Sequence, residues 1–369
     1  MADTLTYLDY NATAPLRTEA RAAVETALGV IGNPSSVHRF GRAARRLVED
    51  AREQVAALAG AEPGQVVFTS GGTEANNLAL RGSERRETFV SAIEHDSVLA
   101  AAPDAMKIPV DGEGIVDLPG LETLLAEADA PALVSVMLAN NETGVIEPVA
   151  EVREIAHRHG ALFHCDAVQG AGKIPVDFAG LGADMMTLSA HKIGGPRGAG
   201  ALIVADAVDL TALNAGGGQE RGRRGGTENV IGISGFGAAA QAAAKLDEVE
   251  AVASLRDRLE NEALARVPRA RIFGAGAPRL ANTIKIGIPG LAAETQVISL
   301  DLDGVAVSAG AACSSGKVAP SHVLQAMGVG EEWAACSIRV SLGRNTTEAD
   351  IARFLDAWSG LAEPRTSAA

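Results

Sequence analysis

The chain has 369 residues, of which 47% are hydrophobic but only 3% aromatic, so it can bury a large aliphatic core in one or two domains. Its formal net charge of −14 argues against a nucleic-acid-binding surface, which needs clustered positive charge. No stretch reaches the roughly 20 apolar residues that span a bilayer, no signal sequence begins the chain, and three cysteines are too few for a disulfide framework or a zinc site. We therefore expect a soluble, cytoplasmic protein without direct contact to nucleic acid or membrane.

Strand-like apolar segments alternate with helical patterns along most of the chain. This alternation predicts an α/β fold with a largely parallel sheet, and ligands of such sheets bind beyond the carboxyl ends of the strands. In chain order we predict a helix over 40–59, a strand over 66–69, a helix over 74–80, strands over 89–91 and 133–138, a helix over 149–159, and strands over 162–166 and 185–189.

A change of composition near residue 246 predicts a domain boundary. An alanine-rich helix precedes it, and a charged helix over 248–262 follows. The segments 282–286 and 337–341 alternate polar and apolar residues, which predicts antiparallel strands with one solvent-exposed face. A capped amphipathic helix is expected over 347–361.

Candidate functional residues follow the predicted strand 185–189. Ser189, His191 and Lys192 stand just before a glycine-rich turn. A lysine in this setting can form a Schiff base while its neighbours bind a phosphate, although an isolated lysine in a turn is more often an ordinary surface residue. Asp166 and Gln169 end the preceding strand, where a carboxylate could keep a pyridoxal nitrogen protonated and an amide could reach the phenolate oxygen. A strand-end aspartate alone more often forms a turn, but two successive strand ends favour a cofactor site.

Two further segments fit the same cofactor. The run 70–74 places glycines before a helix, where backbone amides can bind an anion, although an ordinary helix cap would look alike. His95 follows the predicted strand 89–91 and could lie on a cofactor ring and move protons, or be a hydrogen-bonded bystander.

These segments resemble the class V aminotransferase family, and within it the NifS/IscS type of cysteine desulfurase. No single block of sequence identifies the family, but the number of matching blocks and their order along the chain do. The matching blocks are YLDYNAT at 7–13, GNPSSVH at 32–38, FTSGGTEANNL at 68–78, EH at 94–95, NNETG at 140–144, the segment 166–173, the segment 189–198, GGGQERGRRGGTEN at 216–229 and VSAGAACSSG at 307–316.

The resemblance implies a pyridoxal-phosphate-dependent transferase of fold type I. Its large cofactor-binding domain, residues 14–246, would hold a mainly parallel central sheet flanked by helices. A smaller α+β domain, residues 1–13 and 247–369, would carry a mobile loop with Cys313. The implied roles are Lys192 as cofactor anchor, Asp166 at the pyridine nitrogen, Gln169 at the phenolate oxygen, His95 on the ring, Gly72, Thr73, Ser189 and His191 at the phosphate, Thr227 at the same phosphate from the second subunit of a homodimer, Asn140 near cofactor and substrate, and Arg339 at the substrate carboxylate.

Cys313 would decide the activity. By resemblance, its thiolate takes the sulfur of L-cysteine as a persulfide, alanine leaves, and the sulfur passes to an iron–sulfur scaffold or another acceptor protein. Contact with an iron–sulfur cluster through that persulfide is implied by the resemblance only. Nearby Lys317 would favour the thiolate, whereas Cys165 and Cys336 lie in apolar surroundings and suit a structural role.

Other activities stay open from the sequence. A selenocysteine lyase or a transaminase would use the same fold, and an inactive regulatory partner of another desulfurase would lack the chemistry of Lys192 and Cys313. Glu147 and Arg197 depart from the commonest family pattern, where Gln and Lys are frequent. The short C-terminus leaves scaffold docking open, and the acceptor could serve general iron–sulfur assembly, nitrogenase or tRNA thiolation.

Overall fold

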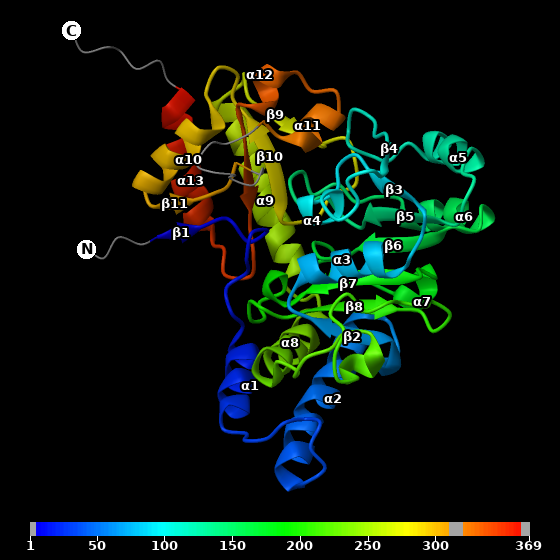
Figure 1. Cartoon of the computed structure of the whole chain (residues 1–369). Helices are drawn as coiled ribbons and strands as arrows, with labels where there is room; N and C mark the ends of the chain where they lie inside the picture. The colour runs from blue at the N-terminus through cyan, green and yellow to red at the C-terminus, as the bar shows by residue number, and fades with distance from the viewer. Residues whose placement is uncertain (1–4, 310–319, 363–369) are drawn as a thin grey trace.

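The computed structural model describes residues 5–309 and 320–362, and within them the larger sheet has seven strands (Figure 1). β8 runs antiparallel to both of its neighbours, and every other pair in this sheet is parallel. The expected mainly parallel α/β fold is therefore confirmed. The order across the sheet is β2 (Val66–Thr69), β8 (Gly200–Val204), β7 (Met185–Ser189), β6 (Leu162–Asp166), β5 (Ala132–Met137), β3 (Glu87–Ser91) and β4 (Met106–Ile108).

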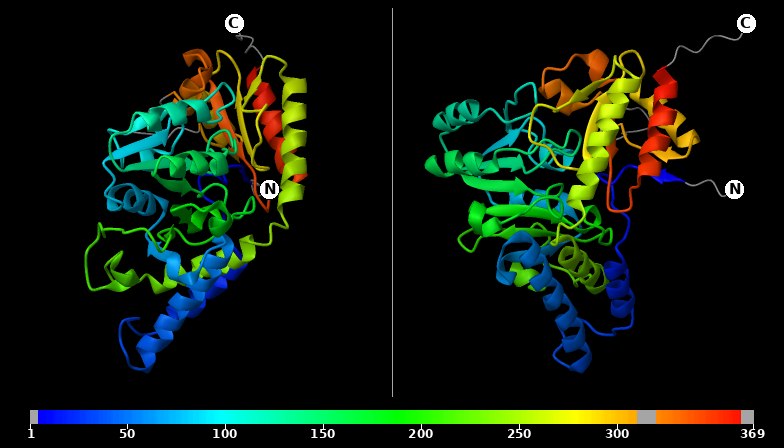
Figure 2. Two further views of the ribbon diagram at one scale, coloured as in Figure 1. Left: turned by 90° about the vertical axis from the view of Figure 1, so that its right-hand side faces the viewer. Right: turned by 180° about the vertical axis from the view of Figure 1, so that it is seen from behind.

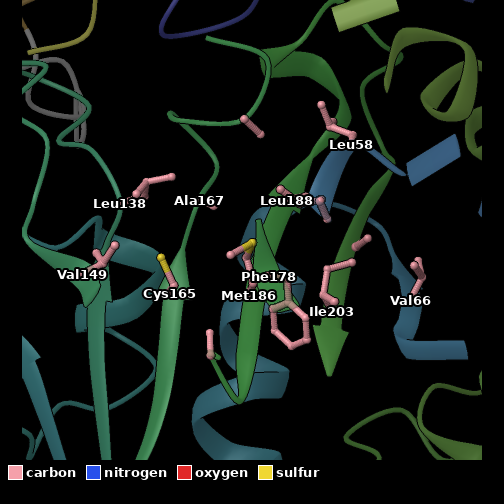
Figure 3. Packing of buried hydrophobic residues seen from close by; sticks show 14 of the residues in the cluster. Leu58, Val66, Leu138, Val149, Cys165, Ala167, Phe178, Met186, Leu188 and Ile203 are labelled. Carbon is pink, nitrogen blue, oxygen red and sulfur yellow. The ribbon is translucent and has the colours of Figure 1, made fainter. Parts of the chain in front are cut away.

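Helices cover both faces of this sheet, which explains why most residues of its strands are apolar and buried. Along β2, Val66 and Phe68 enter one hydrophobic core and Val67 enters the other. Cys165 of β6 lies in the first of these cores, near Leu138 (Figure 3). The helices in this part are α1 (Thr18–Leu28), α2 (Arg39–Ala59), α3 (Gly72–Gly82), α4 (Asp96–Leu99), α5 (Leu118–Ala126), α6 (Val149–Arg158), α7 (Phe178–Leu181) and α8 (Val230–Ala243).

A smaller antiparallel sheet forms a separate core with the C-terminal helices. Its strands are β9 (Arg271–Phe273), β10 (Thr283–Gly287) and β12 (Ser337–Ser341), with β10 in the middle. The long helices α9 and α13 lie side by side against it (Figure 2). The division of the chain at residues 13 and 246 stays a prediction. The remaining elements are β1 (Thr6–Tyr7), which pairs with β11 (Val305–Ala306), and the helices α9 (Val249–Arg266), α10 (Ala293–Leu302), α11 (His322–Ala326), α12 (Glu331–Ala334) and α13 (Glu348–Ala362).

The prediction of one solvent-exposed face on β10 and β12 is wrong. The two strands are antiparallel as expected, but every residue of both is buried, including the polar ones. The reason is that nearby segments supply partners for the charges. Lys285 lies 2.8 Å from the carboxylate of Glu142, and Arg339 lies 2.8 Å from that of Asp9.

Among the described residues, none of the helices combines the length and the apolar character needed to cross a bilayer.

Candidate active site

A cavity opens where the strands of the larger sheet end. Because β8 is antiparallel to both β2 and β7, the strands β2, β3, β5, β6 and β7 all end at the same edge of the sheet. Eight of the predicted cofactor residues line this one cavity: Gly72, Thr73, His95, Asp166, Gln169, Ser189, His191 and Lys192.

Lys192 ends a short turn of 3-10 helix (Ala190–Lys192) that continues β7. Its Nζ donates to the carbonyl oxygen of Asn11 at 2.5 Å and to that of Ala12 at 3.1 Å. Burial, and next the positive charge of Arg339, lower the pKa of Lys192 to about 8. A larger fraction of this amine is therefore neutral and nucleophilic near pH 7 than in an exposed lysine.

Asp166 and Gln169 lie at the end of β6, as expected. The Asp166 carboxylate accepts hydrogen bonds from the Val168 amide at 3.0 Å and from Asn76 Nδ2 at 2.8 Å. The Gln169 amide donates to the carbonyl oxygen of Asn11 at 3.0 Å, the same oxygen that Lys192 contacts. Lys192 and the Gln169 amide are thereby brought to one point of the cavity.

The turn before α3 forms one end of the cavity. Gly71 stands at the N-terminus of α3 and no side chain caps this end. A side chain on Gly200 of β8 would collide with Gly71, because its Cβ would lie 2.6 Å from the Gly71 Cα. Within the described chain, Ser189 Oγ is buried without a hydrogen-bond partner, so its hydroxyl is free to donate to an anion. A phosphate therefore fits here.

His191 and Arg197 border the same recess. Burial, and next the charge of Lys192, lower the pKa of His191 to about 4, so this imidazole is neutral near pH 7 and can donate one hydrogen bond to an anion. Arg197, a departure from the family pattern without an expected role, adds a positive charge to this end of the cavity.

Asn140 does not line the cavity among the residues that the structure describes, and its neighbour Asn141 does. The Asn140 side chain is committed to its own turn, since Oδ1 accepts from the amides of Glu142 and Thr143 and Nδ2 donates to the carbonyl oxygen of Ile93. Asn140 therefore shapes the turn that presents Asn141.

Arg339 lies beside the site from the smaller sheet. It donates to the Asn141 carbonyl oxygen at 3.0 Å and to Asp9 at 2.8 Å, while its buried Nε has no partner within the described chain. The positive charge of Arg339 contributes, after burial, to the lowered pKa of Lys192.

Thr227 is exposed and is not among the residues lining the cavity. The segment before it is held to the helices α3 and α2 by two ion pairs. Arg224 contacts Glu74 at 2.8 Å, and buried Glu220 contacts Arg52 at 2.8 Å. Thr227 is therefore an exposed residue that follows an anchored segment.

Cys313 lies outside the described residues, but both flanks of its segment are described. Lys285 Nζ donates to the Ala309 carbonyl oxygen at 2.8 Å on one side. On the other side, Ser321 Oγ donates to Glu142 at 2.7 Å. Since Lys285 and Glu142 pair with each other at 2.8 Å, one buried ion pair holds both flanks.

Cys165 and Cys336 are buried free thiols, in keeping with a structural role. Burial, and next the negative charges of Asp166 and Glu94, raise the pKa of the Cys165 thiol well above its usual range. A thiol that stays protonated is a poor nucleophile, so Cys165 does not compete for substrate sulfur.

Sequence reasoning missed the polar residues that support the site. Asn11 receives bonds from both Lys192 and Gln169, and Asn76 and Ser97 line the cavity beside His95. Asn11 and Asn76 lie within blocks shared with the family, and that membership is the signal that could have found them.

Comparison with known proteins places these observations in a family. The model of the class-V aminotransferase family matches residues 6–354. A cysteine desulfurase of Cereibacter sphaeroides is 46% identical over 365 residues, covering 95% of this chain and 94% of the relative. A cysteine desulfurase IscS of Dictyoglomus turgidum is 42% identical over 373 residues, covering 97% and 94%. The X-ray structure of a NifS-like protein from Rickettsia africae superposes with a TM-score of 0.90 at 39% identity, covering 97% of this chain and 99% of that one.

Proposed function

The chain belongs to the class-V aminotransferase family and is a pyridoxal-phosphate-dependent cysteine desulfurase, and we propose that Cys313 carries the sulfur that it removes from L-cysteine. The cavity at the strand ends, where Lys192, Asp166 and His95 meet an anion-binding turn, supports the cofactor-dependent chemistry. Cys313 is assigned from its place in the block VSAGAACSSG at 307–316, which resembles the family. A solved structure named SspA in complex with cysteine, 29% identical with a TM-score of 0.80 and covering 93% of this chain and all of that one, supports cysteine as the substrate.

The donor set of the cavity fits pyridoxal phosphate. Lys192 would hold the cofactor covalently, Asp166 would face its pyridine nitrogen, and Gln169 its phenolate oxygen. When bound, the cofactor withdraws electrons from the substrate, which makes its α-proton acidic and weakens the bond from the β-carbon to sulfur. The phosphate would be held by Gly72, Thr73, Ser189 and His191, with Thr227 added by a second subunit.

Lys192 and Cys313 would divide the chemistry. The Lys192 amine takes the α-proton, and Arg339 fixes the substrate carboxylate with Asn141 beside it. The Cys313 thiolate attacks the substrate sulfur, so a sulfur–sulfur bond forms while the carbon–sulfur bond breaks. The electron pair of the carbon–sulfur bond stays on the three-carbon fragment. This fragment takes up one proton at its β-carbon, regains the α-proton from Lys192, and leaves as alanine.

The sulfur would then pass from Cys313 to an acceptor protein, for iron–sulfur cluster assembly or for thiolation. Contact of the persulfide with a cluster under assembly belongs to this proposal. We also propose a homodimer, because exposed Thr227 stands on an anchored segment and could complete the phosphate site of a neighbouring copy.

The test measures alanine, sulfide and protein-bound persulfide made from L-cysteine. We expect Cys313→Ala to lose persulfide and sulfide, and Cys165→Ala, the matched control, to retain them. Lys192→Ala should also lose the visible absorbance of covalently bound cofactor. Amino transfer that survives Cys313→Ala would favour a transaminase, a preference for selenocysteine would favour a lyase, and protein that binds no cofactor would favour a regulatory partner.

A further inference from the structure

A short series of hydrogen bonds joins two sides of the cofactor cavity. Asn76 Nδ2 donates to Asp166 Oδ2 at 2.8 Å and to Ser97 Oγ at 2.8 Å. Ser97 Oγ lies 2.8 Å from His95 Nδ1, and the Ser97 backbone amide donates to the same nitrogen at 3.0 Å. Asn76 and Ser97 have no place in the proposed chemistry, yet both are buried and line the cavity.

The direction of each bond in this series is fixed. A carboxylate accepts only, so the Asn76 group facing Asp166 must be the NH2, and its two hydrogens serve Asp166 and Ser97. The reverse orientation would place the amide oxygen against the Asp166 carboxylate. In the observed orientation, Asn76 Oδ1 has no hydrogen-bond partner among the described residues.

The direction continues to His95. Since Ser97 Oγ accepts from Asn76, its own hydrogen is free to point at His95 Nδ1. The Ser97 backbone amide can only donate. His95 Nδ1 thus faces two donors, so its lone pair must be free to accept and the ring proton must sit on Nε2.

We propose that Asn76 and Ser97 are positioning residues that fix His95 as the Nε2-protonated tautomer, so that this ring offers the cofactor cavity an N–H donor and not a lone pair. The inference rests on the proposed function, in which His95 lies on the cofactor. A neutral His95 of this tautomer cannot accept the α-proton at Nε2, which leaves Lys192 as the proton acceptor. If Nδ1 were protonated as well, its N–H would face the backbone N–H of Ser97, and two donors would point at each other.

The tautomer can be measured in the unaltered holoenzyme by two-bond 1H–15N correlation NMR with 15N-labelled histidine. The chain has only 7 histidines, and the His95 signals are those absent from the spectrum of His95→Gln. We expect a protonated Nε2 and a bare, hydrogen-bonded Nδ1. A proton on Nδ1, or averaging between the two tautomers, would overturn the proposal. This outcome does not depend on whether the enzyme removes sulfur from cysteine.

A kinetic cycle tests whether Ser97 acts through His95. Loss of the hydrogen bond from the Ser97 hydroxyl to His95 predicts that Ser97→Ala lowers kcat by about fivefold to tenfold, whereas Ser97→Thr keeps the hydroxyl and the rate. In a His95→Ala background, Ser97→Ala should change kcat by less than about twofold, because the two residues act as one unit. An equal loss in both backgrounds would make Ser97 merely structural and contradict a positioning role.

Ser91→Ala is the matched control for this cycle. It removes another buried hydroxyl nearby, which donates to Glu94 at 2.6 Å and not to His95. Its effect on kcat should be the same factor with and without His95. A failure of the proposed function would be seen separately, as sulfide release that does not depend on Lys192, and would leave the NMR result standing.

Discussion

Removing one partner of the buried pair Lys285 and Glu142 should lower the free energy of unfolding by several kilocalories per mole. Their side chains are 0% and 1% exposed, so neither charge can turn to water. Lys285→Met keeps the length of the side chain but leaves Glu142 with Ser321 as its remaining side-chain partner. Stranding a buried charge costs about 3–5 kcal/mol.

The expected loss lies at the lower end of that range. Lys285 is the cross-strand neighbour of Arg339, and their like charges repel across the pair β10 and β12. Removing Lys285 relieves this repulsion, so we expect Lys285→Met to lower the free energy of unfolding by about 3 kcal/mol. For a chain of this size the urea m-value is about 3 kcal/mol/M or higher, so urea unfolding followed by tryptophan fluorescence should show the midpoint moving down by up to about 1 M.

The double variant distinguishes the ion pair from simple packing. Adding Glu142→Gln to Lys285→Met removes the stranded charge while Gln can still accept from Ser321, so more than half of the lost stability should return. If the two single losses merely add, or if Lys285→Met unfolds at the midpoint of the unaltered protein, the pair does not stabilise the fold as argued.

Three further outcomes follow from the site. Because the pKa of Lys192 is lowered to about 8, cofactor-free protein should bind pyridoxal phosphate slowly below pH 8 and faster above it, as measured by stopped-flow absorbance. A midpoint of the rate near the pKa of an ordinary lysine would contradict this. Gly200→Ala should displace the turn before α3 and weaken cofactor affinity at least about tenfold in an absorbance titration, while Gly112→Ala, whose Cβ would meet open space, should leave it unchanged. Cys165 and Cys336 should react with a thiol reagent only after denaturation, measured in protein whose third cysteine is replaced by alanine; fast labelling of the native protein would show that they are accessible.

The strand ends of the larger sheet could be predicted from the sequence because the signal there is local. Asp166 and Lys192 each stand at the end of a mostly apolar, mostly buried strand, and parallel strands bring such ends to one edge of the sheet. The same logic predicted β2, β6 and β7 with their observed bounds. It could not show that β8 is inserted antiparallel between β2 and β7, since a short apolar run carries no sign of its direction.

The hydrogen bonds around His95 lay beyond sequence reasoning for a different reason. Asn76 is 21 residues from Ser97 and 90 from Asp166, and no periodicity links such positions. Asn140 and Asn141 pose a similar problem, because adjacent asparagines in one motif look alike until the turn decides which of them faces the cavity.

The error on β10 and β12 explains the environment of Lys192. An alternating pattern indicates that two faces of a strand differ, but it does not indicate that the polar face meets water. Here that face is buried, and its charges are paired with Asp9 and Glu142 from elsewhere in the chain. The positive charge of buried Arg339 adds to the effect of Lys192's own burial, and both lower the pKa of Lys192. A residue of the smaller sheet therefore lowers the pKa of a lysine that follows a strand of the larger sheet.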